Sequence, residues 1–142
     1  MNRPVAALTV DAQITFLPVA DLRRSAAFYE GALGLPLIVD QGTCRIYGVC
    51  GRAYLGICER PGAVPHPGVI VTLVSPAVDA WHARLAGAGV QVAAAPSFSE
   101  QYRIYHAFYR DPDGHLVEIQ EFDDPAWAGP GTQPRRGGLP AL

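Results

Sequence analysis

The stretch from Asp111 to Phe122 reads DPDGHLVEIQEF and predicts a tight turn that leads into a β-strand. Pro112 suits the second position of a type I turn, and Gly114 suits the left-handed residue that follows it. Side chains alternate along a strand, so Glu118 shares one face with three other residues: Leu116, Gln120 and Phe122. A carboxylate on such a face is costly unless something binds it. Glu118 is therefore the first candidate functional residue. A glutamate that is hydrogen-bonded within the protein, or exposed at a sheet edge, would give the same pattern without a function.

The turn also predicts how the strand before it is paired. If residues 112–114 form a three-residue hairpin loop, Phe108 faces Glu118 and His106 faces Gln120. The four side chains then share one face, and His106 lies diagonally within reach of Glu118. A two-residue turn would slip the register by one and move His106 to the other face. The glycine that closes the loop favours the three-residue form.

Three interpretations of His106 and Glu118 remain open at this point. The pair could act as a general base and its partner, or it could supply two ligands of a metal site. It could also be a hydrogen-bonded polar pair that only shapes a pocket. The other histidines are weaker candidates: His82 is expected to pack on a helix or lie at the surface, and His115 alternates to the opposite face and is expected to be exposed.

Composition limits the class of protein. The 142 residues are 49% hydrophobic and 17% charged, which is typical of one globular domain. The net charge of −2 gives no indication of a nucleic-acid or membrane-surface partner. All eleven basic residues are arginine, so Schiff-base chemistry and a P-loop are excluded. No apolar run approaches the roughly 18 residues of a membrane span.

The cysteines are odd in number and contain no CxxC pair. Cys44, Cys50 and Cys58 therefore indicate neither a disulfide framework nor a zinc ribbon. We expect buried free thiols in a reducing compartment, which favours a cytoplasmic location.

The order of predicted elements occurs twice along the chain. Strands are expected at 13–19, 37–40, 43–49 and 53–59 with a helix at 22–34, and again at 69–74, 90–94, 104–110 and 115–122 with a helix at 75–87. This divides the chain into a leader (1–12), module one (13–60), a linker (61–68), module two (69–122) and a Pro/Gly-rich tail (123–142). Two such modules would enclose a cleft, and Trp127 in the tail could cover it or contact a partner subunit.

Several motifs in this order resemble a known family. They are FLPVADL at 16–22, SAAFY at 25–29, LGL at 33–35, FYRDPDG at 108–114 and VEI at 117–119. Together they resemble the glyoxalase/bleomycin-resistance/dioxygenase superfamily, also called vicinal oxygen chelate proteins, from about Gln13 to Phe122. The resemblance implies an α+β fold in which two βαβββ modules form an open barrel around a site. It also implies a homodimer.

The resemblance implies a divalent metal held by histidine and glutamate, and this chain departs from that pattern. Glu118 matches the closing glutamate ligand. Ile14 and the pair Val69–Ile70 stand where the two histidines are expected, and neither position can bind a metal. His66 lies nearby in the linker but out of register. We therefore expect no cofactor, while leaving a divalent ion open if Glu118, and less readily His66, were to bind one.

These observations favour a small-molecule-binding protein with a degenerate metal site, which would bind or sequester an organic compound. The predicted ligand-contacting residues are Phe16, Tyr54, His106, Phe108, Glu118 and Gln120, with His106 and Glu118 as the candidate catalytic pair. The alternative is a metal-dependent lyase, isomerase or dioxygenase that uses Glu118 and His106. A third interpretation is a purely structural dimerisation module.

Overall fold

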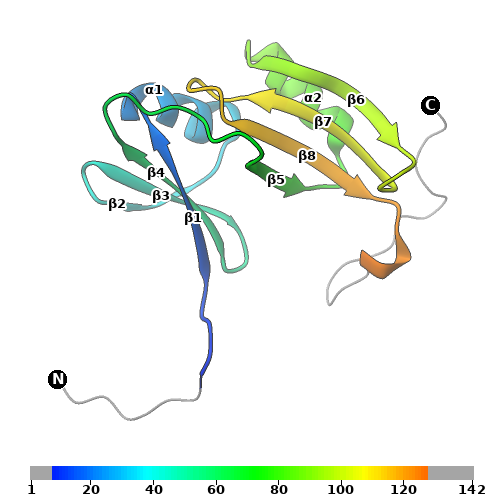
Figure 1. The fold of residues 1–142 in the computed structure, drawn as a ribbon, viewed down its shortest axis with the longest axis horizontal. Helices are drawn as coiled ribbons and strands as arrows, with labels where there is room; N and C mark the ends of the chain where they lie inside the picture. The colour runs from blue at the N-terminus through cyan, green and yellow to red at the C-terminus, as the bar shows by residue number, and fades with distance from the viewer. Residues whose placement is uncertain (1–7, 128–142) are drawn as a thin grey trace. The chain divides into compact units, whose positions relative to one another are not determined.

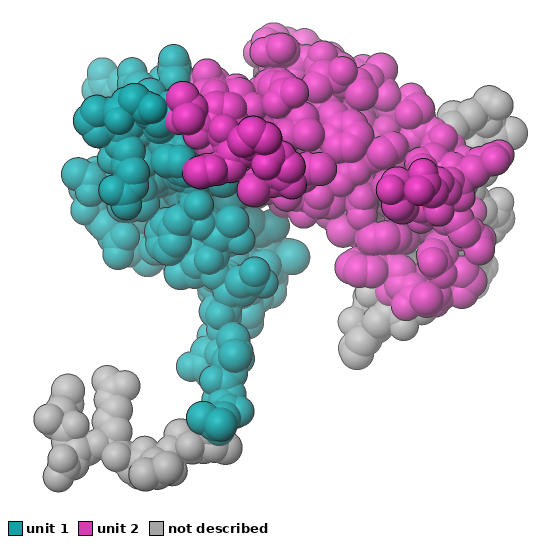
Figure 2. All heavy atoms as spheres, viewed as in Figure 1, with its two compact units in different colours: residues 1–63 teal, residues 64–142 magenta. Residues whose placement is uncertain are grey.

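A computed structural model describes residues 8–127 of the chain (Figure 1). The chain divides into two compact units, Met1–Ala63 and Val64–Leu142 (Figure 2). Each unit carries its own sheet and helix. Within the described residues, no helix has the length and apolar character needed to cross a membrane.

The first unit has the order β-α-β-β-β. Its strands are β1 (Gln13–Val19), β2 (Leu37–Asp40), β3 (Cys44–Cys50) and β4 (Ala53–Glu59), and its helical segment consists of α1 (Leu22–Ala26) and η1 (Ala27–Ala32). The sheet order is β1-β4-β3-β2, with β1 parallel to β4 and the other pairs antiparallel. The core of this unit contains buried side chains from α1, η1 and one face of the sheet, including Leu17, Tyr29, Tyr47 and Ile57.

The second unit repeats this arrangement. Its strands are β5 (Ile70–Val74), β6 (Gln91–Ser99), β7 (Ile104–Arg110) and β8 (Leu116–Phe122), with α2 (Val78–Gly87) between β5 and β6 and a short 3-10 turn, η2 (Pro125–Trp127), after β8. The sheet order β5-β8-β7-β6 matches that of the first unit, again with a parallel outer pair. The predicted α+β fold of two βαβββ modules is therefore confirmed. How the two modules are arranged around a cleft stays a prediction.

The first helix differs from its prediction as a single helix over 22–34. It begins as α1, with the Asp21 side chain accepting a hydrogen bond from the Arg24 N–H, and continues as the π-helix η1. The Leu33 N–H donates to the Phe28 carbonyl at 2.9 Å, five residues back, as in a π-helix. Apolar spacing alone does not distinguish a π-turn from an α-turn, because both bury the same stripe of residues.

The hairpin before β8 has the predicted three-residue loop. The Gly114 N–H donates to the Asp111 carbonyl at 3.0 Å, and the Asp111 N–H donates to the His115 carbonyl at 3.0 Å. Gly114 has φ +92°, which is the left-handed conformation expected of it. His115 corrects one prediction, because it is buried rather than exposed. Its backbone N–H donates to the buried Asp111 carboxylate at 2.8 Å, so the turn folds over this residue.

The prediction of free buried thiols was wrong for two of the three cysteines. Cys44 and Cys58 form a disulfide, and Cys50 is free but exposed. The register between β3 and β4 pairs Cys44 directly with Cys58, with Cα atoms 4.1 Å apart. Directly opposite residues on antiparallel strands can approach this closely, which sequence spacing did not reveal. The cysteines therefore no longer indicate that the protein is located in a reducing compartment.

Candidate functional site on the second sheet

One face of the second sheet carries a polar cluster on the side turned away from α2. Tyr105 and Tyr109 of β7 face the helix, since their hydroxyls contact Asp79 at 2.5 Å and His82 at 2.9 Å. Alternation along β7 turns His106 and Phe108 to the opposite side, which we call the helix-free face. The register pairs His106 with Gln120 and Phe108 with Glu118, as predicted from the turn.

Glu118 is the centre of this cluster and its carboxylate is fully engaged. Oε1 accepts a hydrogen bond from the Thr72 hydroxyl at 2.8 Å, and Oε2 accepts from His106 Nδ1 at 2.6 Å. Gln120 is oriented with its amide nitrogen toward Glu118, where it donates to both oxygens at 3.1 Å, because the reverse orientation would place oxygen against oxygen. Each carboxylate oxygen therefore accepts one hydrogen bond of its own, from Thr72 or His106, and the two oxygens share the Gln120 N–H. These bonds satisfy the polar atoms of a residue that is only 6% exposed.

His106 and Phe108 extend the cluster along β7. Their rings lie 4.9 Å apart between centroids in an edge-on arrangement. The His106 side chain keeps 16% of its surface exposed, compared with 9% for the Glu118 side chain. The carboxylate therefore lies beneath, and the imidazole is the more accessible polar group.

These residues do not fit a resident divalent ion. Within residues 8–127, no three His, Cys, Asp or Glu side chains gather closely enough to hold one. Both Glu118 oxygens already accept hydrogen bonds from protein side chains. His66 lies before β5 and is exposed, and its backbone carbonyl accepts from the Val69 N–H at 3.3 Å.

Thr72 is the site residue that sequence reasoning missed. The histidine position was placed at Val69–Ile70, but the parallel register between β5 and β8 sets Thr72 beside Glu118. A threonine in a β-rich run gives no functional signal, since threonine is common in strands. Only the strand register could have identified it.

Two predicted ligand residues, Phe16 and Tyr54, belong to the first unit. They lie on neighbouring strands, where Phe16 is paired with Gly56 and Tyr54 with Ile14. The Phe16 ring lies directly over Gly56, and a Cβ there would be 2.4 Å from the ring. Their role toward a ligand stays a prediction.

Trp127 packs against the end of β8. Its ring stacks on Phe122 with centroids 4.3 Å apart. Alternation along β8 puts Phe122 on the same face as Glu118 and Gln120. Trp127 therefore adds a second aromatic contact near this face, in place of the extended tail predicted there. The rest of the predicted tail, 128–142, lies outside the described residues.

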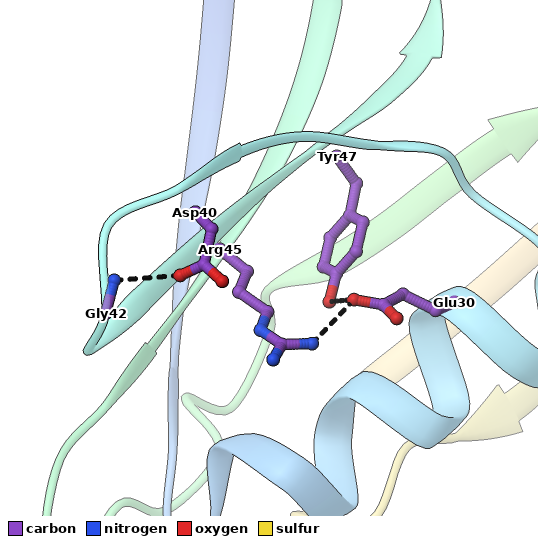
Figure 3. A network of polar contacts seen from close by, with 5 residues as sticks. All are labelled: Glu30, Asp40, Gly42, Arg45 and Tyr47. Atoms are coloured by element: carbon purple, nitrogen blue, oxygen red, sulfur yellow. Dashed lines mark hydrogen bonds and ion pairs between the residues drawn. The ribbon is translucent and has the colours of Figure 1, made fainter.

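The first unit holds a separate polar network that sequence analysis did not single out. Figure 3 shows Arg45 and Tyr47 of β3 pointing toward Glu30 of η1, where Arg45 Nη1 and the Tyr47 hydroxyl each donate to Glu30 Oε1 at 2.8 Å. Burial of Tyr47 and its bond to Glu30 raise the pKa of the phenol well above its usual range. An open hollow of about 620 Å³ lies alongside, lined by residues from Asp21 to Gly31 together with Arg45 and Glu59. Because Glu30 joins η1 to β3 through two donors, a structural role accounts for this network.

The tyrosines beneath the second helix serve the core in a similar way. Burial, followed by the charge of Asp79, raises the pKa of Tyr109 to about 12. The contact of His82 with the Tyr109 hydroxyl agrees with the packing role expected for this histidine.

Comparison with known proteins assigns the family. The family model for the Glyoxalase/Bleomycin resistance protein/Dioxygenase superfamily matches residues 12–119. No protein of curated function matches the chain.

Solved structures share the fold at low sequence identity. One is described as a lactoylglutathione lyase from Agrobacterium tumefaciens, with TM-score 0.64, 24% identity and coverage of 89% of this chain and 100% of the other. A glyoxalase-related enzyme from Fulvimarina pelagi has TM-score 0.66, 21% identity and coverage of 80% and 88%. TioX from Micromonospora sp. ML1 has TM-score 0.65, 18% identity and coverage of 78% and 97%. With its family model spanning most of the sequence, the chain belongs to the glyoxalase/bleomycin resistance protein/dioxygenase superfamily.

Proposed function

We propose that this protein binds a small organic compound on the helix-free face of its second sheet, without a resident metal ion. The observation that carries the proposal is the carboxylate of Glu118, both of whose oxygens accept hydrogen bonds from protein side chains. A carboxylate held in this way orients its neighbours, and a metal ion would have to displace protein donors to bind it. The function is then recognition or sequestration of the compound.

The surroundings of the cluster support an organic ligand. Phe108 lies against His106, and Ile70 and Val74 on β5 are exposed by 44% and 46%. Ile70 and Val74 lie on the same face of β5 as Thr72, because side chains alternate along a strand. An apolar surface with a few fixed polar groups is the usual composition of a small-molecule site.

The proposal is tested by a compound screen with two matched variants. Ligands that stabilise the wild-type protein against heat should lose about fivefold in affinity on Phe108→Ala, since a stacked aromatic contact contributes on the order of 1 kcal/mol. Tyr102→Ala is the control, because Tyr102 is an aromatic residue exposed by 64% in the turn between β6 and β7. Equal loss in both variants, or no stabilising compound in a broad screen, would contradict the proposal.

Metal analysis separates this function from a metal-dependent lyase, isomerase or dioxygenase. Protein purified without chelator is expected to contain far less than one equivalent of iron, manganese, nickel or zinc. Stoichiometric metal that disappears on Glu118→Ala would contradict the metal-free binding proposal and favour the enzyme alternative. The catalytic roles predicted for His106 and Glu118 depend on that result.

Two further properties are proposed, one implied by the family resemblance and one predicted from the sequence. A homodimer is expected, and sedimentation equilibrium tests it. A cytoplasmic location is also proposed, and it requires that the Cys44–Cys58 bond persist in a reducing compartment, where structural disulfides are rare. Thiol labelling in intact cells tests that requirement.

A further inference from the structure

We propose that the helix-free face of the second sheet takes aromatic carboxylates, with the carboxylate bound by Arg110 and the ring packed on Phe108. This inference rests on the proposed binding function and names the ligand class for the same face. It is carried by the position of Arg110 and by the lack of an acidic partner for its guanidinium within the described part of the chain.

The first step is the position of Arg110. It is the last residue of β7, and alternation along the strand puts its side chain on the same face as those of His106 and Phe108. The register pairs Arg110 with Gln91 of β6 and with Leu116 of β8. Arg110 therefore lies at one end of the helix-free face, next to the aromatic residue already assigned to the ligand.

The second step is that Arg110 keeps N–H groups for a ligand. Its side chain is partly exposed, and Nη1 donates to the Gly114 carbonyl at 2.9 Å. A guanidinium stays protonated and carries five N–H donors in a planar fork, so this one bond leaves others unused. The bond to the turn also orients the guanidinium before a ligand arrives.

The third step is that the neighbouring carboxylates have other partners. Asp111 Oδ1 accepts hydrogen bonds from two backbone N–H groups of the turn, at 2.8 and 3.0 Å. Glu118 lies diagonally across from Arg110, and its two oxygens accept from Thr72 and His106. The positive charge of Arg110 is therefore left for an acidic group from outside the chain.

The fourth step is that an anion at Arg110 is attracted more strongly than it is repelled. It would contact the guanidinium directly, whereas the nearest negative charge on the same face, that of Glu118, lies one pair farther along the two strands. Only 9% of the Glu118 side chain is exposed, beneath its own donors. Coulomb energy falls with distance, and direct contact adds charge-assisted hydrogen bonds.

Phe108 supplies the surface for the rest of the ligand. Its ring is partly exposed, and its partner on β6 is Ala94, which is too small to cover a ring. Residues two apart on a strand are separated by roughly 7 Å, so a carboxylate on Arg110 brings an attached ring over Phe108. Offset stacking between the two rings then holds the ligand flat on the sheet.

Two matched probes test the charge of the ligand: 2-naphthoate and its neutral isostere 2-naphthamide. The carboxylate should bind the wild-type protein about fivefold more tightly, since an ion pair at a partly exposed site contributes on the order of 1 kcal/mol. Its affinity should fall as salt is added, because salt screens exposed charges, and that of 2-naphthamide should not. Isothermal titration calorimetry measures both.

Substitution of the guanidinium should remove the preference. In Arg110→Met the ratio between the affinities for 2-naphthoate and 2-naphthamide should fall to about one, and the salt dependence should disappear. Arg110→Lys keeps the charge and should keep most of the preference. Arg52→Met, the same change at an exposed arginine of the first unit, should alter neither affinity. The salt dependence of the wild type tests the same charge without any substitution.

The outcomes distinguish this inference from the proposed function. If the wild type binds 2-naphthamide as tightly as 2-naphthoate, or if the preference survives in Arg110→Met, the inference is overturned and small-molecule binding stands. If neither probe binds, the compounds found by the screen decide. Acids that lose affinity on Arg110→Met support the inference, and neutral compounds alone, or acids unaffected by that change, overturn it. A blank screen would overturn both.

Discussion

The two sheets have the same strand order but carry opposite chemistry at matched positions. Phe16 and Thr72 each lie five residues before the N-cap of the following helix, which is Asp21 in one unit and Ala77 in the other. Each is paired with the adjacent parallel strand, Phe16 with Gly56 and Thr72 with Glu118. In the first unit an aromatic ring covers a glycine, and in the second a hydroxyl binds a carboxylate.

This difference shows that the framework and the site depend on separate residues. The cores of both units use tyrosines and aliphatic side chains on the helix side of the sheet, such as Tyr47 and Ile57 in one and Tyr109 and Ile119 in the other. The opposite faces can then vary without disturbing the helix contacts. The chemical difference between the two units is concentrated on those faces.

The largest expected effect on this difference between the sheets comes from removing the Glu118 carboxylate of the second sheet. Glu118→Ala should lower the free energy of unfolding by about 2 kcal/mol, because the donors on Thr72, His106 and the buried Gln120 lose their acceptor. Urea denaturation measures the change. Glu100→Ala in an exposed turn serves as the control and should stay within about 0.5 kcal/mol of the wild type. A loss below about 1 kcal/mol for Glu118→Ala would mean that the cluster does not hold the sheet together.

The disulfide is a second difference between the units, because Cys44–Cys58 lies in the first. Cys58→Ser should destabilise the protein by about 2–3 kcal/mol, the magnitude expected for a short closed loop. Thermal unfolding with and without reductant measures it, and reductant should have no effect on the variant. Cys50→Ser, at the exposed free thiol, should be neutral. Three reactive thiols in the native, unreduced wild type would contradict the assignment.

The Phe16–Gly56 contact predicts a smaller effect that depends on the pair. Gly56→Ala should cost about 1 kcal/mol, because the new methyl group collides with a ring that is half exposed and can rotate away. In a Phe16→Ala background the same change should cost close to zero. A double-mutant cycle by chemical denaturation gives the coupling, and additive costs would show that the ring does not rest on Gly56.

The smallest expected effect concerns a feature common to both sheets, a buried tyrosine on the helix side, and it appears in the pH dependence of stability. The pKa of Tyr109 is raised from 10.0 to about 12 in the folded protein. The folded state therefore holds this proton more tightly than the unfolded state, so its contribution is present below pH 10 and is lost as the pH rises toward 12. Unfolding free energies measured between those values should fall, and Tyr109→Phe should flatten part of that fall. Ionisation of Tyr109 near pH 10 in an absorbance titration would contradict the shift.

Sequence reasoning recovered the parts of the fold that depend on local signals. The strand bounds 13–19, 37–40, 53–59 and 104–110 agree with the structure, and Gly114 correctly indicated the hairpin register that joins His106 to Gln120. The parts that depend on pairing between distant strands were not recovered. Thr72 beside Glu118 and Cys44 opposite Cys58 are brought together across 46 and 14 residues by sheet registers that no local pattern specifies.

The register of β5 against β8 has a consequence for how readily this chain could change its chemistry. Thr72→His would place an imidazole beside Glu118, and His106 already lies on the other side of that carboxylate. Three such side chains are the set that a catalytic metal commonly requires. A single substitution at Thr72 would therefore complete a potential set of metal ligands. Directed evolution for metal-dependent turnover would have Thr72 as a defined first position to alter.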